Sequence, residues 1–251
     1  MASSAADAPQ PHEATSSADA DVERVQALMT AAGIRVVVCD IDSTLWDGNA
    51  HLMQGTITRQ SDLMIKDSRG RELVMFAETV RVLRVCQSVG FRLGVSSHCT
   101  KRNVGQRVMD TFGLTPFFEA KLVNIDYREP KTTHISRIMK EAKVKSHEVL
   151  FFDDIQQNVN GAVKKLGIHG CHVPEGISMD KLLEALRNAG KRRQQSDSFK
   201  SFFTKAPDPN AGEEAQQLKR RKVGGDKAAG ASESPVVVDG EGDESDKGKG
   251  G

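Results

Sequence analysis

The sequence predicts an α/β fold in which a parallel sheet is flanked by helices. Between residues 21 and 190, short apolar runs alternate with segments whose apolar residues recur at helical spacing. The runs at 34–39 and 149–152 are almost continuously apolar, which is typical of strands buried on both faces of a sheet. Because alternating strands and helices form parallel sheets, we expect one folded domain over residues 21–190.

The predicted elements follow one another in regular alternation. We expect helices at residues 21–32, 78–89, 101–110, 132–142, 156–165 and 178–188, and strands at residues 34–39, 91–95, 117–122, 149–152 and 168–173. The alternation breaks between Trp46 and Phe76, where the polar segment 66–71 predicts a small hairpin or flap instead of a further domain.

Composition separates both ends of the chain from this domain. Residues 1–20 form an arm rich in Ala and Ser, and residues 191–251 form a tail that combines basic and acidic blocks with Gly, Ser and Pro. Both segments are predicted to be disordered, because they lack the apolar residues that a core needs. The arm contains no Lys or Arg, which argues against a secretory signal or a transit peptide. No apolar run approaches the roughly 20 residues of a membrane span.

Charge and cysteine content exclude further classes of protein. The formal net charge of +1 gives no overall field that would attract nucleic acid or an anionic membrane, so such binding needs a local patch. The four cysteines are widely spaced and form no CxxC pair. We therefore expect free thiols and an intracellular protein, with neither a disulfide framework nor a cysteine-based metal site.

Reactive side chains follow the ends of the strongest predicted strands. Aspartates follow the strands at 34–39 and 149–152, a serine and a histidine follow the strand at 91–95, and a lysine precedes the helix at 132–142. These residues are Asp40, Asp42, Ser97, His98, Lys131, Asp153 and Asp154. Because parallel strands end at the same edge of a sheet, we expect these side chains to converge on one crevice.

Four carboxylates in one crevice need a compensating cation, because like charges a few ångströms apart repel strongly in a low effective dielectric. Mg²⁺ binds oxygen ligands in octahedral geometry, and this Asp-rich set without thiolates suits Mg²⁺ better than zinc. The alternative is that Asp40, Asp42, Asp153 and Asp154 merely cap turns and helices. Capping explains each acid separately, but it does not explain why all four converge with Lys131.

In this order, the residues resemble the four motifs of the haloacid dehalogenase superfamily of phosphotransferases. The closer resemblance is to the magnesium-dependent phosphatase-one family. It is carried by Thr44-Leu45-Trp46, by Lys131-Thr132-Thr133-His134, and by Phe151-Phe152-Asp153-Asp154 with Asn158 behind it. The resemblance covers about residues 34–188, and it implies a Rossmann-like fold with a minimal hairpin cap and an open crevice.

The resemblance also implies a role for each residue of the crevice. Asp40 attacks phosphorus to give an aspartyl-phosphate, and Asp42 protonates the leaving group and then activates water. Ser97 and Lys131 hold the phosphoryl oxygens. The implied Mg²⁺ ligands are Asp40, the backbone carbonyl of Asp42, and Asp154, with Asp153 as a partner behind them.

Two residues leave their roles open. Where the family commonly has arginine after the second-motif serine, this chain has His98, so the bidentate phosphate clamp of an arginine is absent. His98 either donates to phosphate when it is protonated or is a solvated loop histidine. Trp46 is the only tryptophan, and it either anchors the core or faces the substrate.

The implied activity is Mg²⁺-dependent hydrolysis of phosphomonoesters. An open crevice admits bulky substrates, so phosphotyrosine in proteins and phosphorylated sugars are candidates, and the 3′-phosphate of a DNA end is an alternative that only the tail favours. A function of a different class is a nuclear adaptor that binds the sliding clamp and in which the phosphatase-like domain is secondary. No motif fixes the substrate.

One segment of the tail resembles a docking peptide. Residues 196–205 are similar to the peptide that binds the sliding clamp, proliferating cell nuclear antigen, with Phe199, Phe202 and Phe203 as the apolar anchors. In this chain Ser196 stands where that peptide begins with Gln, and a non-specific aromatic patch is the alternative.

Two further segments of the tail resemble nuclear signals. Lys219-Arg220-Arg221-Lys222 resembles a nuclear localisation signal, although such runs are also common as solvated charge. Val236-Val237-Val238, followed by acidic residues, is similar to a segment that adds a strand to the small ubiquitin-like modifier. We therefore expect the protein in the nucleus, the cytoplasm or both.

Overall fold

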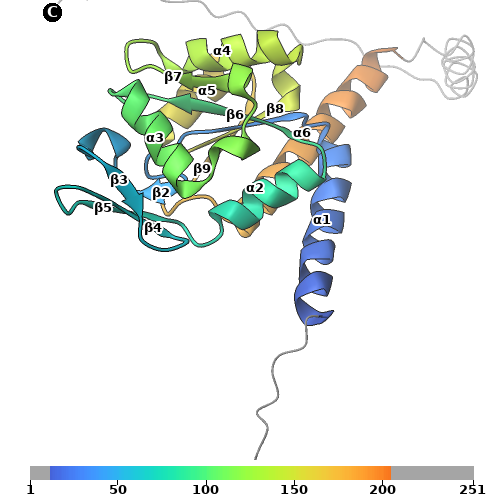
Figure 1. Cartoon of the computed structure of the whole chain (residues 1–251). Helices are drawn as coiled ribbons and strands as arrows, with labels where there is room; N and C mark the ends of the chain where they lie inside the picture. The colour runs from blue at the N-terminus through green and yellow to red at the C-terminus, as the bar shows by residue number, and fades with distance from the viewer. Residues whose placement is uncertain (1–11, 205–251) are drawn as a thin grey trace, which may run out of the picture. The chain divides into compact units, whose positions relative to one another are not determined.

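The computed structural model describes the backbone of residues 12–204 and the side chains of residues 18–201. The described residues up to Phe202 belong to one compact unit (Figure 1). The proposed signals at 219–222 and 236–238 lie outside the described residues. None of the described helices has both the length and the hydropathy that crossing a bilayer requires.

A five-stranded parallel sheet forms the centre of the domain. Its strands lie in the order β7 (Val123–Ile125), β6 (Arg92–Ser97), β1 (Val36–Cys39), β8 (Val149–Asp153) and β9 (His169–His172). Each adjacent pair is parallel. All four residues of β1 are buried, as expected for the central strand of a sheet covered on both faces. The predicted fold class is therefore confirmed.

Six helices cover the two faces of this sheet (Figure 1). They are α1 (His12–Ala32), α2 (Thr79–Ser88), α3 (Arg102–Phe112), α4 (Lys131–Ala142), α5 (Gln156–Leu166) and α6 (Met179–Thr204). Alternate residues of β1 point to opposite faces. Val37 packs in one apolar cluster with α1, α2, α3 and α6. Val38 packs in a second cluster with α4 and α5.

The segment between β1 and α2 forms a small antiparallel sheet. Its strands lie in the order β2 (Trp46–Asp47), β5 (Glu72–Met75), β4 (Met64–Asp67) and β3 (Ile57–Arg59), with a 3-10 turn, η1 (Ala50–Leu52), between β2 and β3. The sequence predicted a single hairpin or flap here. Only β4 and β5 and the turn between them fit that prediction, because the other two strands are too short to show an alternating pattern.

Two helices extend into segments that were predicted to be disordered. The first helix begins at His12 instead of residue 21, and it is held to α2 by buried Val25 and by an ion pair between Asp21 and Arg81. The last helix continues through residues 191–204. Its Lys, Arg and Gln residues are common in disordered chains, but they are also good helix formers.

One predicted strand is misplaced. Residues 117–122 were expected to form a strand, but two 3-10 turns occupy this region, η2 (Thr115–Phe117) and η3 (Ala120–Leu122), and the strand β7 follows them. Pro116 lies in the first of these turns, where its fixed φ and missing amide hydrogen favour a turn over a strand.

The predicted free thiols are confirmed, because all four cysteines are unpaired. Cys39 and Cys86 are buried in the core, and burial raises the pKa of both thiols. These side chains therefore act as small apolar groups and not as nucleophiles.

An arginine at the start of β6 joins three elements. Arg92 forms a bidentate ion pair with Glu119, at 2.7 and 2.6 Å, and donates to the carbonyl of Ala142 at 2.8 Å. We expect Glu119→Gln to lower the free energy of unfolding by about 1 kcal/mol at neutral pH, because a partly exposed bidentate pair contributes about that much.

The effect of this substitution depends on pH. Hydrogen bonding and charge from Arg92 hold the pKa of Glu119 below its usual value. The pair therefore stabilises the fold above the unfolded-state pKa, and the stabilisation is lost as pH falls through the lower folded-state pKa. Urea unfolding between neutral pH and about pH 3 measures this. Glu175→Gln, at an exposed position, is the control. An equal loss of unfolding free energy in Glu119→Gln and Glu175→Gln would contradict the prediction.

Candidate active site

A cavity of about 150 Å³ lies at the carboxyl edge of the parallel sheet, where β1, β6 and β8 end. Every predicted reactive residue lines it except Asp153, which is buried beside it. Its lining consists of Asp40, Asp42, Ser43, Asn49, His51, Ser97, His98, Cys99, Thr100, Lys131, Asp154, Ile155 and Asn158. The strand-end residues thus converge on one crevice, as their positions in the sequence indicated.

The carboxylate of Asp40 is buried, and only one of its oxygens is held. Its backbone amide donates to Phe152 at 2.9 Å, which fixes the end of β1 against β8. Oδ2 lies 2.8 Å from the Lys131 ammonium group, whereas buried Oδ1 has no hydrogen-bond partner among the described residues. Burial raises the pKa of Asp40 to about 7, although Lys131 acts in the opposite direction. The unpartnered oxygen therefore has the position and freedom to contact a cation or an electrophile.

Lys131 is the first residue of α4, and its ammonium group is buried between two carboxylates. Besides Asp40, Nζ contacts Oδ2 of Asp153 at 2.5 Å. Burial alone would lower the pKa of Lys131, but Asp40 and Asp153 outweigh it and raise the pKa. Lys131 therefore stays charged, and it is the only Lys or Arg among the side chains that line this cavity.

Asp153 holds its neighbours in place instead of facing the cavity. Its second oxygen, Oδ1, accepts hydrogen bonds from the backbone amide of Ile155 and from Nδ2 of Asn158, both at 2.9 Å. Asp153 thus joins Lys131, the loop after β8 and the first turn of α5. The sequence pointed to Asn158 only as part of a resemblance, and its role in orienting Asp153 is visible only in three dimensions.

The carboxylates of Asp40, Asp153 and Asp154 are placed to bind a divalent cation. Each offers an oxygen, and these oxygens lie within 4.8 Å of one another. The donor set contains no imidazole or thiolate, which suits a hard cation such as Mg²⁺. Because Asp153 already contacts Lys131, Ile155 and Asn158, Asp40 and the half-buried Asp154 are the better direct ligands. A role for the Asp42 carbonyl stays a prediction.

Asp42 is oriented by one of its two carboxylate oxygens. Oδ1 accepts hydrogen bonds from Nε1 of Trp46 at 3.0 Å and from the backbone amide of Ala50 at 2.7 Å. Burial raises the pKa of Asp42, while these two hydrogen bonds act in the opposite direction. The other oxygen accepts no hydrogen bond from a described residue, so it can exchange a proton with a group in the cavity.

Trp46 anchors the core and does not face a substrate. Its side chain is fully buried and stacks on Phe112 with ring centroids 5.7 Å apart. The indole nitrogen nevertheless contributes to the site, because it holds Asp42. Of the two roles that the sequence left open, the structure supports the first and adds a positioning role.

Ser97 and His98 end β6 beside the cavity. The Ser97 hydroxyl accepts a hydrogen bond from the amide of Cys99 at 3.1 Å, which leaves its own proton available for donation. The His98 ring contacts the carbonyl of Glu129 at 2.9 Å. Burial and the nearby Lys131 charge lower the pKa of His98, so the ring is neutral at neutral pH. His98 therefore does not replace the permanent charge of an arginine.

The region between β2 and β3 adds residues that the sequence did not indicate. Asn49 and His51 line the cavity from the turn η1 and its N-terminal flank, and Thr100 lines it from the loop after β6. For Asn49 and His51, the polar side chains of the segment that interrupts the β/α alternation were the only signal, and nothing distinguished these two from the others there.

Comparison with known proteins identifies the family. A family model described as Acid Phosphatase matches residues 33–192, which is more than half of the chain. The chain belongs to the acid phosphatase family. This confirms the resemblance carried by the four motifs, and every motif lies within the matched residues.

Two known proteins are similar to this chain over most of its described length. Magnesium-dependent phosphatase 1 of Homo sapiens is 25% identical over 175 residues, which are 69% of this chain and 96% of the human protein. A HAD superfamily (subfamily III A) hydrolase from Legionella pneumophila is 14% identical, with a TM-score of 0.43 over 72% of this chain and 95% of that one.

A second solved structure was determined with ligands bound. The 3-deoxy-D-manno-octulosonate 8-phosphate phosphatase from Moraxella catarrhalis, in complex with magnesium ion, phosphate ion and KDO, is 17% identical to this chain. Its TM-score is 0.42, over 72% of this chain and 99% of that one.

The buried lysine gives a direct test of the electrostatics of this acid phosphatase site. Lys131→Met leaves Asp40 and Asp153 buried without their shared cation. We expect the free energy of unfolding to fall by about 3 kcal/mol in metal-free buffer, because removing one partner of a buried ion pair leaves uncompensated charge. We also expect Mg²⁺ to restore more stability to this variant than to the parent.

Thermal unfolding with chelator and with Mg²⁺ measures both effects. Lys121→Met is the matched control, because Lys121 pairs with Glu141 at 3.8 Å on the surface and its side chain is 82% exposed. Equal losses of unfolding free energy in Lys131→Met and Lys121→Met would show that Lys131 does not compensate the buried carboxylates of the site.

Proposed function

We propose that the protein is a Mg²⁺-dependent phosphomonoester phosphatase that works through an aspartyl-phosphate on Asp40. The observation that carries this proposal is the asymmetry of the Asp40 carboxylate. One oxygen is held by Lys131, while the other is buried and unpartnered. Such an oxygen is prepared for attack on phosphorus, and the acid phosphatase family match supports the same reaction class.

The chain's own residues can perform both half-reactions. In the first, an oxygen of Asp40 attacks phosphorus while Lys131 and the Ser97 hydroxyl hold the phosphoryl oxygens. Asp42 gives its proton to the departing oxygen, and it then removes a proton from the water that hydrolyses the acyl phosphate. Mg²⁺, when bound, supplies positive charge against the phosphoryl oxygens and the carboxylates.

The size of the cavity bears on the substrate. A volume of about 150 Å³ accommodates a phosphoryl group but not a large leaving group, which must extend out of the cavity. Ile155 lines the cavity and is 47% exposed, so it offers apolar surface to a leaving group that extends out of the cavity. We therefore propose aryl phosphates of the phosphotyrosine type ahead of sugar phosphates.

The end of α6 gives some support to a partner interaction. Phe199, Phe202 and Phe203 lie in this helix, and their spacing of three and four residues places the positions on one helical face. The Phe199 side chain is 66% exposed. We propose these residues as a sliding-clamp peptide, and the segment 236–238 as a contact for the small ubiquitin-like modifier. The adaptor and DNA 3′-phosphatase alternatives depend on these tail segments.

Hydrolysis assays test the phosphatase proposal. We expect activity to require Mg²⁺, and Asp40→Asn to lower kcat by roughly a thousandfold or more, since it removes the nucleophile. Asp42→Asn is expected to lower kcat by about 10²- to 10⁴-fold on a sugar phosphate and by less on a phosphotyrosine peptide, because a phenoxide leaves with less help from an acid.

The control for these variants is Asp62→Asn, whose carboxylate is on the surface of the small sheet with a 99% exposed side chain. Circular dichroism establishes that each variant is folded. Hydrolysis retained by folded Asp40→Asn would rule out Asp40 as the nucleophile. A folded parent protein that hydrolyses neither substrate would favour the adaptor function.

The tail also makes a separate prediction about location. We propose that 219–222 is a nuclear localisation signal, and that changing all four residues to alanine moves a tagged chain from the nucleus to the cytoplasm. Fluorescence microscopy measures the nuclear fraction, with the basic cluster Lys191-Arg192-Arg193 changed to alanine for comparison. Identical distributions of the parent and the 219–222 variant would show that this run is only solvated charge.

A further inference from the structure

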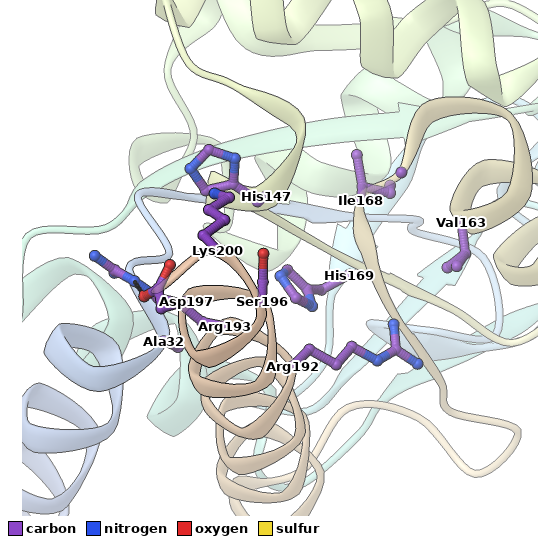
Figure 2. Close-up of a pocket in the computed structure, with 11 residues that line it drawn as sticks. Ala32, His147, Val163, Ile168, His169, Arg192, Arg193, Ser196, Asp197 and Lys200 are labelled. Atoms are coloured by element: carbon purple, nitrogen blue, oxygen red, sulfur yellow. Dashed lines mark ion pairs between the residues drawn. The ribbon is translucent and has the colours of Figure 1, made fainter. Parts of the chain in front are cut away.

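A second cavity, of about 420 Å³, lies at the opposite edge of the parallel sheet (Figure 2). It is formed by the end of α1, the 3-10 turn η4 (Ser146–Glu148) that precedes β8, the connection from α5 to β9, and the second half of α6. It shares no lining residue with the catalytic cavity. Nothing in the proposed phosphatase mechanism uses it.

The lining of this cavity is strongly basic. Arg192, Arg193 and Lys200 line it from α6, His147 and His169 line it from the opposite side, and Asp197 is the only carboxylate. Figure 2 shows these side chains around the cavity. The permanent positive charge therefore comes from α6, and the opposite side contributes the two histidines.

The acid in the lining, Asp197, offsets little of the charge of the two arginines. Asp197 lies 3.9 Å from Nε of Arg193, and both side chains are about half exposed, so this ion pair is weak. Arg192 forms no hydrogen bond or ion pair with any residue that the structure describes. An exposed guanidinium group without a carboxylate partner can bind a phosphate through two parallel N–H donors.

The remaining lining is apolar or able to form hydrogen bonds. Partly exposed Val163 supplies apolar surface, whereas Ala32 and Ile168 are only 1% and 2% exposed, and Ser196 supplies a hydroxyl (Figure 2). Burial, followed by the nearby charge of Arg192, lowers the pKa of His169. A concave site of several hundred Å³ with converging polar groups has the size of a small-molecule site.

We propose that this cavity binds a small phosphorylated molecule with an apolar portion. The phosphate group would lie against Arg192 and Arg193, and the apolar portion would pack on Val163. The concave shape favours a small molecule over a nucleic acid, whose phosphates are read along an extended basic surface. The proposal does not depend on the catalytic activity, because the two cavities share no residue.

Histidine side-chain NMR of the full chain tests the proposal, because the seven histidines include reporters for both cavities. His147 and His169 line the second cavity, and His51 and His98 line the catalytic one. The probe is phenylphosphonate, a phosphate mimic with an apolar ring and a P–C bond that a phosphatase does not hydrolyse. We expect its titration to shift the His147 and His169 signals in a saturable manner, in the parent and equally in Asp40→Asn.

Variants of α6 assign the binding to this cavity. Arg192→Ala is expected to raise the Kd for phenylphosphonate, measured from the His147 and His169 signals, by about tenfold, because it removes one charged hydrogen-bonding partner. Ser196→Glu places a negative charge in the cavity and is expected to abolish the response. Arg187→Ala, an exposed arginine of α6 outside the lining, is the matched control and is expected to bind as the parent does.

Three results would contradict the proposal. Unshifted His147 and His169 signals in the parent would overturn the proposal, as would an unchanged response in Ser196→Glu. A single-stranded oligonucleotide is the second probe. If it shifts these signals while phenylphosphonate does not, the basic face binds nucleic acid and the small-molecule proposal is wrong.

Discussion

The buried ammonium group of Lys131 is the contact on which the catalytic edge of this protein depends. It joins α4 to the ends of β1 and β8, because it lies 2.8 Å from Asp40 and 2.5 Å from Asp153. Even with this cation, burial raises the pKa of Asp40 to about 7. One lysine therefore does not offset all the carboxylates, and a divalent cation beside Asp154 would complete the balance of charge.

The two aspartates that contact Lys131 have different roles. Asp153 bonds Lys131, Ile155 and Asn158, so both of its oxygens are engaged in holding the site together. Asp40 leaves one oxygen unpartnered. The nucleophile is thus positioned through a neighbour that does not itself react, which keeps Asp40 oriented while its second oxygen remains free.

The location of the site was predictable from the sequence because parallel topology leaves few alternatives. A strand such as Val36–Cys39, buried on both faces, can present polar groups only where it ends, and Asp40 follows at once. The orientation of those groups was not predictable. Asn158 and Trp46 hold Asp153 and Asp42 through contacts that depend on side-chain direction, and no pattern in the sequence encodes that direction. The helix ends were also missed, because charged helix formers at 191–204 have the composition of a disordered tail.

The net charge of +1 conceals two local fields of opposite sign at the two edges of the sheet. At the carboxyl edge the cavity is lined by three carboxylates and one lysine, so without a bound cation a phosphate dianion meets like charge there. At the amino edge the cavity is lined by three permanent cations and one carboxylate. A phosphorylated molecule therefore encounters local charge of opposite sign at the two edges. Binding at the first depends on the divalent cation, whereas binding at the second depends on guanidinium groups that remain charged at any physiological pH. Removal of the divalent cation would weaken phosphate binding at the carboxyl edge and leave the amino edge unchanged, so the two sites differ in mechanism as well as in position.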